Sequence, residues 1–556
     1  MNSIPADSIF TGHDRVVSQP SLGVLGAGTM GTGIAQLLLA SGLQVTVYDP
    51  HGDALSRATR AIEQGLGRLM QKGTLTAEFC SSALKNLTCT STLSNISKLD
   101  GVIEAAPEDF ALKVQLLSQV ADVLSPEAFL ATNTSSLSVS ALAAALPDPS
   151  RLLGIHFFNP VHAMSLVELV RGDATADDVF ERAWDLVEQI GKAPIACRDT
   201  PGFIVNRVAR GYYGEALRLV GDHGAEPEDV DRALVLGLGF PLGPCALMDL
   251  IGMDVNLSVS RQVWQAFFYE ARFAPHPLQQ RLVDTGRLGR KTGHGFYRYP
   301  RAEITTPSEP SLPVRPLRVM FAGQSAALDA WARPLVAAGH HVELFGDHLE
   351  SIAPGDWDGA FEIGEALPEV RAARRARLAS CLPGNAWIAS DDLSVTSTEI
   401  EVATGRVAWR FCAWPGGQSD VRKGIEVAFA PHCPEMRQEQ VRALWQSTGR
   451  EMLCGPDLPG LIGPRTLVML INEAAFAVES GVATPEAIDR AMCLGTGYPC
   501  GPLEWADRVG PDRVVALLRT LRELFGERYR PAPWLVRRAT AGWPLSDSPA
   551  SSQRWR

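Results

Sequence analysis

The residues that most clearly suggest chemistry are a histidine and a glutamate in two apolar segments. His156 lies near the end of RLLGIHFFNP, and Glu168 lies inside LVELV. An unpaired charge in a buried strand is costly, so Glu168 needs a partner, and a histidine on the neighbouring strand is the simplest one. A carboxylate on one imidazole nitrogen leaves the other nitrogen to take a proton from a substrate hydroxyl. The simpler alternatives are a packed core histidine and a structural ion pair.

Further polar side chains follow expected strand ends in the same part of the chain. Glu108 follows GVIEA, Asn133 and Ser135 follow AFLAT, and Asn159 follows His156. Ligands of open α/β sheets bind at the carboxyl ends of the strands. We therefore expect these side chains to line one site.

A glycine-rich turn lies upstream, in LGVLGAGTMGTGIAQLLLASGLQVTVYD, which reads as strand, turn, helix and strand. Gly26 permits a tight turn, Gly28 lets backbone amides approach a pyrophosphate, and Gly31 lets the helix pack on the strand. Asp49 follows Gly26 by 23 positions, which suits a carboxylate that binds ribose hydroxyls and would repel the extra phosphate of NADP. The alternative for Asp49 is a solvated acid at a strand end. The pattern predicts NAD as the cofactor.

These residues need a sheet to position them, and the surrounding sequence predicts one. Strand-like segments alternate with helical periodicity and lie at 22–25, 44–49, 87–91, 101–105, 128–132, 151–157, 165–170 and 193–197. A helix is expected over 176–191, with Thr175 as a possible cap. The residues expected on its buried face are Val179, Ala183, Leu186, Val187 and Ile190. The pattern is typical of a doubly wound α/β domain.

The bulk composition excludes several classes of protein. The chain has 556 residues, enough for three to four domains, and a net charge of -11, which argues against a nucleic-acid binder. Its ten cysteines form no CxxC pair, so neither a disulfide framework nor a metal site is expected. No signal peptide or membrane-spanning run is evident, which predicts a cytoplasmic protein with no membrane partner.

Eight motifs in the first half occur in an order that resembles one family. They are GAGTMG, IEAAPED, NTSSL, HFFNP, LVELV, TPGFIVNR, GFPLGPCALMDLIG and GRKTGHGFY, within residues 22–298. Together they resemble the 3-hydroxyacyl-CoA dehydrogenase family. The resemblance implies a Rossmann-like NAD-binding domain followed by an all-α domain, like that of 6-phosphogluconate dehydrogenase, which completes the acyl-CoA site.

The resemblance also implies roles for individual residues. His156 would be the general base and Glu168 its orienting partner. Ser135 and Asn206 would hydrogen-bond the reacting oxygen of the substrate. The residues expected to contact NAD are Gly26, Gly28, Thr29, Met30, Gly31, Asp49, Glu108, Lys113, Asn133, Ser135, Asn159 and Lys291.

The lysines and Asn206 have simpler alternatives. Lys113 and Lys291 would then be solvated surface residues, and Asn206 a polar residue at a helix start. Lys72 roughly matches a family lysine that contacts the coenzyme A phosphates. A family serine in the same helix is replaced, we expect by Gly65.

An internal repeat divides the chain. PGFIVNR at 201–207 returns as PGLIGPR at 459–465, an offset of 258, and GLGFPLGPCALMDLIG returns as GTGYPCGPLEWADRVG. Repeats have to be found before folds are assigned, and this one indicates a duplicated helical domain. The segment 317–347 also scans as strand, helix and strand.

The second copy is expected to have lost its chemistry. In the second copy, FAGQSA takes the place of GAGTMG. IASDDLSV takes the place of LATNTSSLSV, is read as two residues shorter, and lacks a serine like Ser135. WRFCAW stands for IHFFNP, which aligns Arg410 with His156. Glu426 remains at the position of Glu168, but Pro464 replaces Asn206. We therefore expect a scaffold, with catalysis confined to the first half.

The predicted domain boundaries follow from these patterns. They comprise an N-terminal tail (1–20), an NAD-binding domain (21–198), a helical domain (199–300), a linker (301–316), a degenerate Rossmann-like domain (317–457), a second helical domain (458–543) and a disordered tail (544–556). The resemblance implies helical domains that pack across a dimer. The tandem copy is expected to form a pseudo-dimer within one chain, and a homo-oligomer remains possible.

The expected activity is oxidation of (3S)-3-hydroxyacyl-CoA to 3-oxoacyl-CoA with NAD. The degenerate second half resembles bacterial enzymes of phenylacetate breakdown that act on 3-hydroxyadipyl-CoA, with 3-hydroxybutyryl-CoA as the alternative substrate. Arg207 and Arg210 could reach a distal carboxylate, although we expect both on the surface. A hydroxy-acid dehydrogenase without a CoA site and a non-catalytic scaffold are the other open readings.

Overall fold

The computed structural model describes residues 20–300, 315–323, 325–364, 366–412, 414 and 424–547. Contacts divide the chain into two compact units, Met1–Asp199 and Thr200–Arg556. Apart from Pro20, Arg315 and Pro316, the expected N-terminal tail and linker lie outside the described residues.

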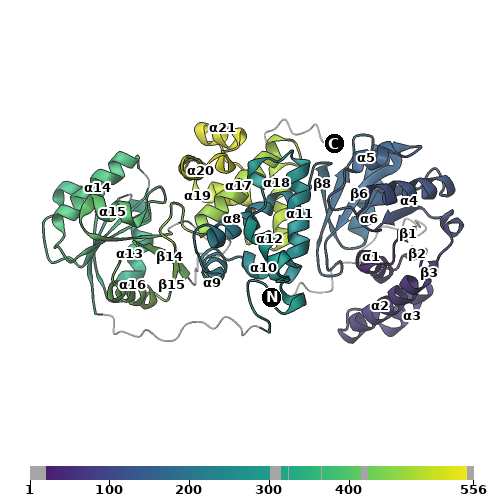
Figure 1. Cartoon of the computed structure of the whole chain (residues 1–556), viewed down its shortest axis with the longest axis horizontal. Helices are drawn as coiled ribbons and strands as arrows, with labels where there is room; N and C mark the ends of the chain where they lie inside the picture. Colours follow the sequence, from purple (N-terminus) through teal and green to yellow (C-terminus); the bar gives the residue numbers. More distant parts are fainter. Residues whose placement is uncertain are drawn as a thin grey trace, which may run out of the picture. The chain divides into compact units, whose positions relative to one another are not determined.

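The first unit is built on an eight-stranded sheet in the order β3-β2-β1-β4-β5-β6-β7-β8 (Figure 1). Its strands are β1 Ser21–Leu25, β2 Gln44–Tyr48, β3 Leu87–Thr90, β4 Gly101–Glu104, β5 Phe129–Thr132, β6 Leu152–Phe157, β7 Leu166–Arg171 and β8 Ala193–Arg198. Neighbours pair in parallel except β6 and β7, which are antiparallel. Strands β4, β5 and β6 are buried along their whole length, which explains their unbroken apolar runs.

The helices of this unit follow its strands in the expected alternation. They are α1 Thr29–Ala40, α2 Gly52–Gln71, α3 Ala77–Lys85, α4 Phe110–Val123, α5 Val139–Ala144 and α6 Asp177–Gln189. The five residues expected on the inner face of α6 are all buried, which confirms the helical period. The cap prediction was wrong. The N-cap is Ala176, and the Thr175 hydroxyl donates to the Leu152 carbonyl at 2.6 Å, because a strand oxygen competes for it.

The second unit contains a seven-stranded sheet in the order β10-β9-β11-β12-β13-β14-β15. Its strands are β9 Arg318–Gly323, β10 His341–Gly346, β11 Gly359–Ile363, β12 Trp387–Ser390, β13 Val407–Phe411, β14 Gly424–Phe429 and β15 Glu451–Gly455. The helices between them are α13 Ser325–Ala337, α14 Pro368–Cys381, α15 Ser397–Thr404 and α16 Glu435–Ser447. This order repeats that of the first sheet without β3. The segment between β10 and β11 contains a single short 3-10 turn where the first sheet has α2, α3 and β3.

Two sets of helices complete the second unit. The first set is α7 Val205–Val208, α8 Arg210–Gly221, α9 Pro227–Arg232, α10 Pro244–Ile251, α11 Met253–Ala266 and α12 Pro277–Asp284. The second is α17 Gly463–Glu479, α18 Pro485–Thr496, α19 Pro502–Val509, α20 Pro511–Phe525 and α21 Pro533–Ala541. Before each set, a bulky residue adopts a left-handed backbone at equivalent positions, Phe203 and Leu461. An α/β domain and a helical domain are thus each present twice.

The two helical sets pack through α8 and α17, about a pseudo-two-fold relation. Arg207 Nε donates to Glu473 Oε1 at 2.6 Å, and the equivalent Arg465 donates to the equivalent Glu215. Gly211 allows close packing, because a Cβ there would lie 3.2 Å from the backbone of Met469. Arg207 is therefore an interface residue and not the surface arginine that we expected.

The C-terminal segment is ordered beyond the expected point. We predicted disorder from Pro544, but Leu545 is fully buried, and its amide donates to Asp507 Oδ1 at 2.6 Å. Ser546 donates to Asp507 Oδ2 through its amide and its hydroxyl. The prediction was wrong for 544–547, because the Leu545 side chain is buried and Asp507 accepts the amides of Leu545 and Ser546. Residues 548–556 lie outside the described part.

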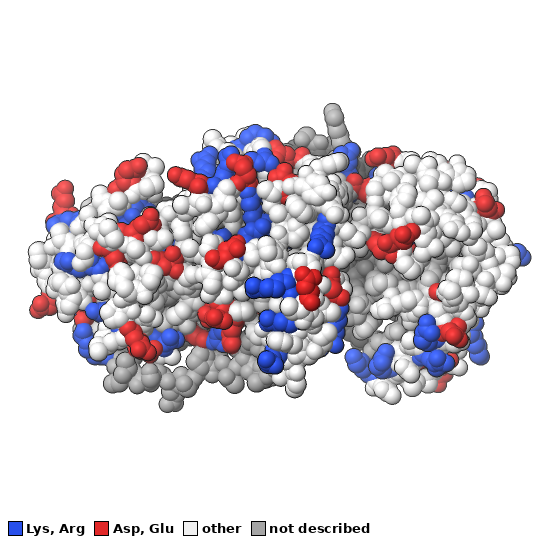
Figure 2. Space-filling model, viewed as in Figure 1, with Lys and Arg blue, Asp and Glu red and all other residues white. Residues whose placement is uncertain are grey.

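The surface charges and the lengths of the helices bear on whether the protein binds nucleic acid or a membrane. Acidic and basic side chains are interspersed on the face that Figure 2 shows. None of the helices that the structure describes has the length and apolar composition needed to cross a bilayer.

Candidate active site

The glycine-rich turn between β1 and α1 has the geometry that a pyrophosphate requires. Gly26 has φ +106°, and a Cβ there would lie 2.8 Å from the Ala105 carbonyl oxygen. A Cβ on Gly31 would lie 1.9 Å from the carbonyl oxygen of Gly26, so the helix can approach the turn only with glycine there. A Cβ on Gly28 would meet nothing within 4 Å. Gly28 thus presents its backbone to an open space at the start of α1.

The start of α1 is available to an anion. Its N-cap, Gly28, has no side chain to satisfy the first amides, and its first turn contains no acidic residue. Gly28 and Thr29 are exposed, whereas Met30 packs partly into the core. Free amides and the helix dipole favour negative charge at this end. This cradle fits the pyrophosphate of NAD.

Asp49 lies directly after β2 and is held towards the turn. Its Oδ2 accepts the amide of Ala27, and its Oδ1 accepts the amide of His51, both at 2.9 Å. These contacts orient the carboxylate beside the glycine-rich turn, where a ribose that follows the pyrophosphate would lie.

A buried ion pair at the end of β4 supports the site. Glu104 and Lys113 are 0% and 1% exposed, and their Oε1 and Nζ atoms lie 2.6 Å apart. Glu104 also accepts the Thr132 hydroxyl and the amide of Ala106, each at 2.6 Å. Lys113 is therefore buried and not solvated. The sequence analysis missed Glu104, although it ends an apolar strand and the burial argument used for Glu168 would have found it.

Glu108 organises the serine-rich loop after β5. Its Oε1 accepts the hydroxyls of Thr134 at 2.7 Å and Ser136 at 2.8 Å, and the amide of Ser135 at 3.0 Å. Burial alone would raise the pKa of Glu108, but Lys113 and these donors outweigh it and lower the pKa. The carboxylate therefore stays charged and fixes the loop that contains Ser135.

His156 and Glu168 face each other across the antiparallel pair of β6 and β7. His156 Nδ1 lies 2.7 Å from Glu168 Oε2, and the two side chains are 6% and 0% exposed. The Phe158 ring packs against the imidazole with a centroid distance of 4.5 Å. The pairing expected from the sequence is present, because the reversal of β7 brings its start beside the end of β6.

Asn133 and Asn159 lie near this pair. Asn133 Oδ1 accepts the amide of Phe157 at 2.8 Å, which ties the end of β5 to the end of β6. Asn159 is exposed after β6. The unit thus brings the glycine turn, Asp49 and the residues after β4, β5 and β6 to one edge of the sheet, the carboxyl ends of its parallel strands.

The other expected site residues belong to the second unit or to α2 of the first. Asn206 is half-buried in α7 of the second unit, and Pro464 takes its place in the repeat. Lys291, also in the second unit, is 43% exposed and pairs with Asp254 at 2.5 Å. Lys72 is exposed at the end of α2. A Cβ on Gly65 in α2 would lie 1.9 Å from Gln36 Oε1, so a serine there would require the end of the Gln36 side chain to move.

The matching edge of the second sheet is filled by arginines. Gly323 is the counterpart of Gly26, with φ +129° against the Ile363 carbonyl, so the first glycine of the turn is the one retained. Our alignment of FAGQSA with GAGTMG was wrong by two residues. Arg374 bridges Glu362 at 3.0 Å and Asp347 at 2.7 Å. Its guanidinium lies 3.3 Å from the position of a Cβ on Gly323, beside the turn.

Two more arginines extend this network. Arg371 occupies the place of Lys113 and pairs with Glu362 at 2.7 Å and Asp391 at 2.5 Å. Arg375 pairs with Asp392 at 2.8 Å. Three guanidiniums thus neutralise the carboxylates at the strand ends, where the first unit leaves its turn exposed.

The counterpart of His156 is Cys412 and not Arg410. Strand pairing aligns Arg410 with Gly154, and Cys412 then faces Glu426. The sequence alignment was wrong because pairing Arg410 with His156 implies a loss of four residues, whereas the chain loses two between α15 and β13. Glu426 accepts the amides of Ile462 and Gly463, the latter at 2.9 Å. The carboxylate that faces a histidine in one copy therefore caps helix α17 in the other.

The segment IASDDLSV is not shortened. The N-cap of α15 is Thr396, which keeps the offset of 258 from Ser138, the N-cap of α5. Leu393 therefore occupies the place of Ser135, and it is buried. A hydroxyl at this position has been replaced by an apolar side chain.

Comparison with known proteins agrees with this geometry, which is that of a dinucleotide-dependent dehydrogenase. Residues 21–200 match the NAD binding domain of 3-hydroxyacyl-CoA dehydrogenase, and residues 202–299 and 460–549 both match its C-terminal domain. A 3-hydroxyadipyl-CoA dehydrogenase of Escherichia coli K12 is 38% identical over 94% of this chain and 98% of its own.

Two further relatives extend the comparison. The crystal structure of a 3-hydroxybutyryl-CoA dehydrogenase from Escherichia coli K12 is 35% identical, covers 94% of this chain and 99% of its own, and has a TM-score of 0.77. A probable 3-hydroxybutyryl-CoA dehydrogenase of Deinococcus radiodurans is 40% identical over 50% of this chain and 99% of its own. The chain belongs to the 3-hydroxyacyl-CoA dehydrogenase family. The double match to the C-terminal domain confirms the duplication.

Proposed function

We propose that this chain oxidises (3S)-3-hydroxyacyl-CoA to 3-oxoacyl-CoA with NAD, and that its first half carries the chemistry. The observation that supports this most directly is the buried His156–Glu168 pair, at the same edge of the sheet as the glycine-rich turn. In the second half, Cys412 stands at the position of the histidine, and Arg374 lies against Gly323.

In the proposed reaction, the imidazole of His156 takes the proton of the 3-hydroxyl group while C3 gives up its hydride. NAD, when bound, accepts that hydride. Glu168 holds the ring through Nδ1 and stabilises the imidazolium that forms, so that the carboxylate need not take the proton itself. General-base catalysis of this kind contributes about 10²–10⁴-fold to the rate.

Ser135 and Asn206 are proposed to hold the reacting oxygen, a positioning effect. The contacts of Glu108 with the amide of Ser135 and the hydroxyl of Ser136 support the first assignment, because they fix the loop. Asp49 is proposed to bind the ribose. Lys113 would act through Glu108, whose Oε2 lies 3.3 Å from its Nζ.

Three contacts rest on the family resemblance alone. We propose that Asn159 and Lys291 contact the cofactor, and that Lys72 contacts the coenzyme A phosphates. The half-exposed state of Lys291 and the exposed state of Lys72 leave both side chains accessible to a ligand.

For the substrate we propose 3-hydroxyadipyl-CoA, in aromatic catabolism of the phenylacetate type. The relative that carries this name shares both halves with our chain. Short-chain 3-hydroxybutyryl-CoA is the second candidate, because another relative of nearly full coverage carries that name.

We also propose that the second half serves as an internal dimer partner. The paired Arg207–Glu473 and Arg465–Glu215 contacts already cover the face of α8. This face should therefore not form a dimer with a second chain, and light scattering should give a solution mass near 60.0 kDa. A dimer that dissociates when α8 is altered would contradict this.

The activity is tested by NADH formation with 3-hydroxyadipyl-CoA, 3-hydroxybutyryl-CoA and the corresponding free hydroxy acids. We expect oxidation of the thioesters and not of the free acids. Equal rates with the free acids would contradict a CoA site, and no NADH with any compound would contradict the dehydrogenase proposal.

A further inference from the structure

Arg210 is a buried cation that has no carboxylate partner. It begins α8 and is 7% exposed. Its Nε donates to the Asn206 carbonyl at 2.9 Å, its Nη1 donates to the Ser260 hydroxyl at 3.1 Å, and its guanidinium lies over the Tyr213 ring at 4.8 Å. Within the described part of the chain, no Asp or Glu forms an ion pair with it. An uncompensated buried charge is costly, so an anion that arrives here would be stabilised.

Several other buried arginines of the same unit have a carboxylate partner, although the buried Arg538 bonds backbone carbonyls. Arg207 pairs with Glu473, Arg465 with Glu215, and Arg410 with Asp457. In each of these three pairs, a carboxylate lies beside the guanidinium. Arg210 instead has a carbonyl, a hydroxyl and an aromatic face.

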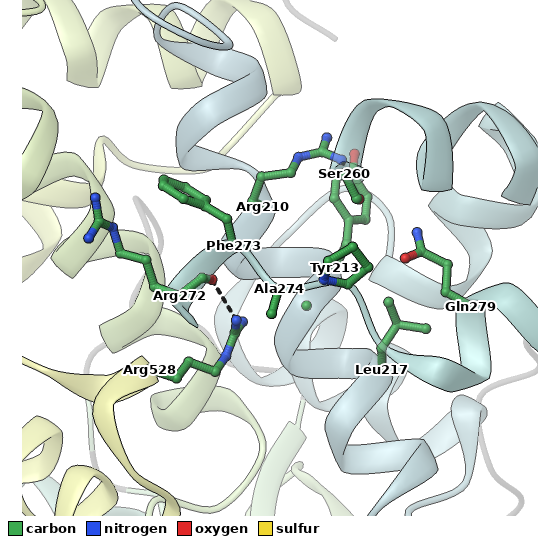
Figure 3. Close-up of a pocket in the computed structure, with 11 residues that line it drawn as sticks. Arg210, Tyr213, Leu217, Ser260, Arg272, Phe273, Ala274, Gln279 and Arg528 are labelled. Atoms are coloured by element: carbon green, nitrogen blue, oxygen red, sulfur yellow. Dashed lines mark hydrogen bonds between the residues drawn. The ribbon is translucent and has the colours of Figure 1, made fainter. Parts of the chain in front are cut away.

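A small cavity lies beside Arg210 (Figure 3). Tyr213, Leu217 and Gln279 form part of its wall, which Arg272 and Arg528 also line. Its volume of about 10 Å³ is close to that of one water molecule, so it suits one oxygen of a carboxylate and not a methylene chain. Arg272 is paired with Glu473 at 2.7 Å, and Arg528 lies 3.6 Å from Glu215.

A second unpartnered polar group lies near Arg210. The hydroxyl of Tyr498 is buried, makes no hydrogen bond, and interacts electrostatically with Arg210. Burial also lowers the pKa of Arg210, while Tyr213 and Tyr498 act in the opposite direction. The phenol groups of these two tyrosines do not neutralise the charge of Arg210. A hydroxyl and a guanidinium with donors to spare fit an anionic oxygen.

The position of Arg210 relative to Asn206 identifies the anion. Asn206 in α7 and Arg210 at the start of α8 are four residues apart, a rise of about 6 Å in helical geometry, and Arg210 Nε donates to the Asn206 carbonyl at 2.9 Å. Asn206 is proposed to hold the oxygen on C3. A carboxylate three carbon–carbon bonds of about 1.5 Å beyond C3 could span that distance. Tyr213 and Leu217 follow Arg210 on the same face of α8, towards the cavity.

We propose that Arg210 is the counter-ion for the carboxylate at the far end of the acyl chain, so that the site selects ω-carboxy-3-hydroxyacyl-CoA thioesters over chains that end in methyl. This rests on the proposed function and deepens it. A methyl-ended chain would leave the guanidinium buried and unpaired, and a site built for a polar group rejects an analogue that lacks it.

The test compares 3-hydroxyadipyl-CoA with 3-hydroxyhexanoyl-CoA, which has the same chain length but no terminal carboxylate. We expect the wild-type chain to favour the first in kcat/KM by about 100-fold. Arg210→Met should lower kcat/KM for the diacid about 100-fold and leave that for the hexanoyl thioester within about threefold. Arg210→Lys should restore part of the preference. Arg218→Met is the matched control on α8, since Arg218 donates to backbone carbonyls, and it should leave the preference unchanged.

Equal losses on both thioesters in Arg210→Met, or no preference in the wild-type chain, would overturn the assignment. If Arg210→Met does not fold, Arg210→Lys and Arg210→Gln supply the same ratio. Calorimetric binding of adipyl-CoA against hexanoyl-CoA measures the carboxylate contact without turnover. If the wild-type chain oxidises no thioester, the proposed function fails, and the binding ratio still decides the role of Arg210.

Discussion

The two Rossmann-like sheets of this chain share a strand order but differ at the edge where a dinucleotide would bind. In the first, the turn at Gly28 is exposed, and one buried ion pair, Glu104–Lys113, lies behind it. In the second, Arg374 lies against the turn at Gly323 and joins carboxylates on two strands. The two edges therefore differ in more than their glycines, because the second has charge pairs of its own.

The base position shows the same difference. His156 faces Glu168 in the first sheet, whereas Cys412 faces Glu426 in the second. Glu426 remains buried but now accepts the amides that begin α17. The carboxylate that faces a histidine in one copy is a helix cap in the other, which predicts different consequences when the two sheets are altered.

The largest contrast is expected at the base position. His156→Gln should lower kcat by about 10²–10⁴-fold, because it removes the general base. The affinity for NAD, measured by fluorescence titration, should not change. Cys412→Ser, at the matching position, should leave kcat within about twofold. Similar losses in the two variants would break the comparison.

The next contrast concerns stability. Arg371→Leu should leave Glu362 and Asp391 short of a buried counter-ion and lower the free energy of unfolding of the second unit by about 3–5 kcal/mol. Urea denaturation measures this, with the exposed Glu369→Gln as a control expected within about 0.5 kcal/mol. The kcat of folded protein should stay the same. A loss of kcat with unchanged unfolding would mean that this network takes part in the chemistry.

A smaller effect is expected from pH. Burial raises the pKa of Glu426 to about 7, although the amides that it accepts and Arg410 act in the opposite direction. The folded pKa lies above the unfolded value, so the protonated side chain stabilises the fold below about pH 4.5, and this contribution is lost as pH rises through about 7. Stability should fall by up to about 3 kcal/mol over that window.

Glu426→Gln isolates this contribution. Burial raises the pKa of Asp489 to about 7 as well, but Asp489 is present in both proteins, so the difference between them reports Glu426. Urea denaturation at pH 5 and pH 8 should show a shallower decline in the variant. Parallel declines in the two proteins would show that Glu426 does not titrate there.

The smallest contrast concerns the acid after the second strand of each sheet. Asp49→Asn should raise the Kd for NAD about tenfold, the equivalent of one charge-assisted hydrogen bond. Asp347→Asn should leave the Kd unchanged, because Asp347 already pairs with Arg374 at 2.7 Å. Calorimetry measures both. Weaker NAD binding in Asp347→Asn would indicate a cofactor at the second sheet.

Much of the first unit could be predicted from its sequence, because burial is a strong local constraint. Apolar runs gave the strand positions, and the cost of burying Glu168 led to His156 as its partner. The same rule would have led to Glu104 and Lys113. The three glycines predicted a turn whose close approaches are those that their spacing requires.

The errors share a different cause, since they involve partners distant in sequence. Cys412 was overlooked because strand register is set by neighbouring strands, while similarity of short motifs implied a deletion of four residues instead of two. Arg207 and Arg210 were expected on the surface because no local pattern shows that α17 covers α8 or that Ser260 reaches Arg210. Thr175 was expected to cap α6, but its hydroxyl donates to the carbonyl of Leu152 in β6.

The pseudo-two-fold contact has a consequence for how this chain can change over time. In a symmetric dimer, every interface substitution appears twice, so both ion pairs must tolerate it. Here Glu215 accepts the hydroxyl of Tyr529, whereas Glu473 accepts Arg272 at 2.7 Å, and Phe273 stands at the position of Tyr529. Joining the copies in one polypeptide has freed each side of the interface to mutate alone.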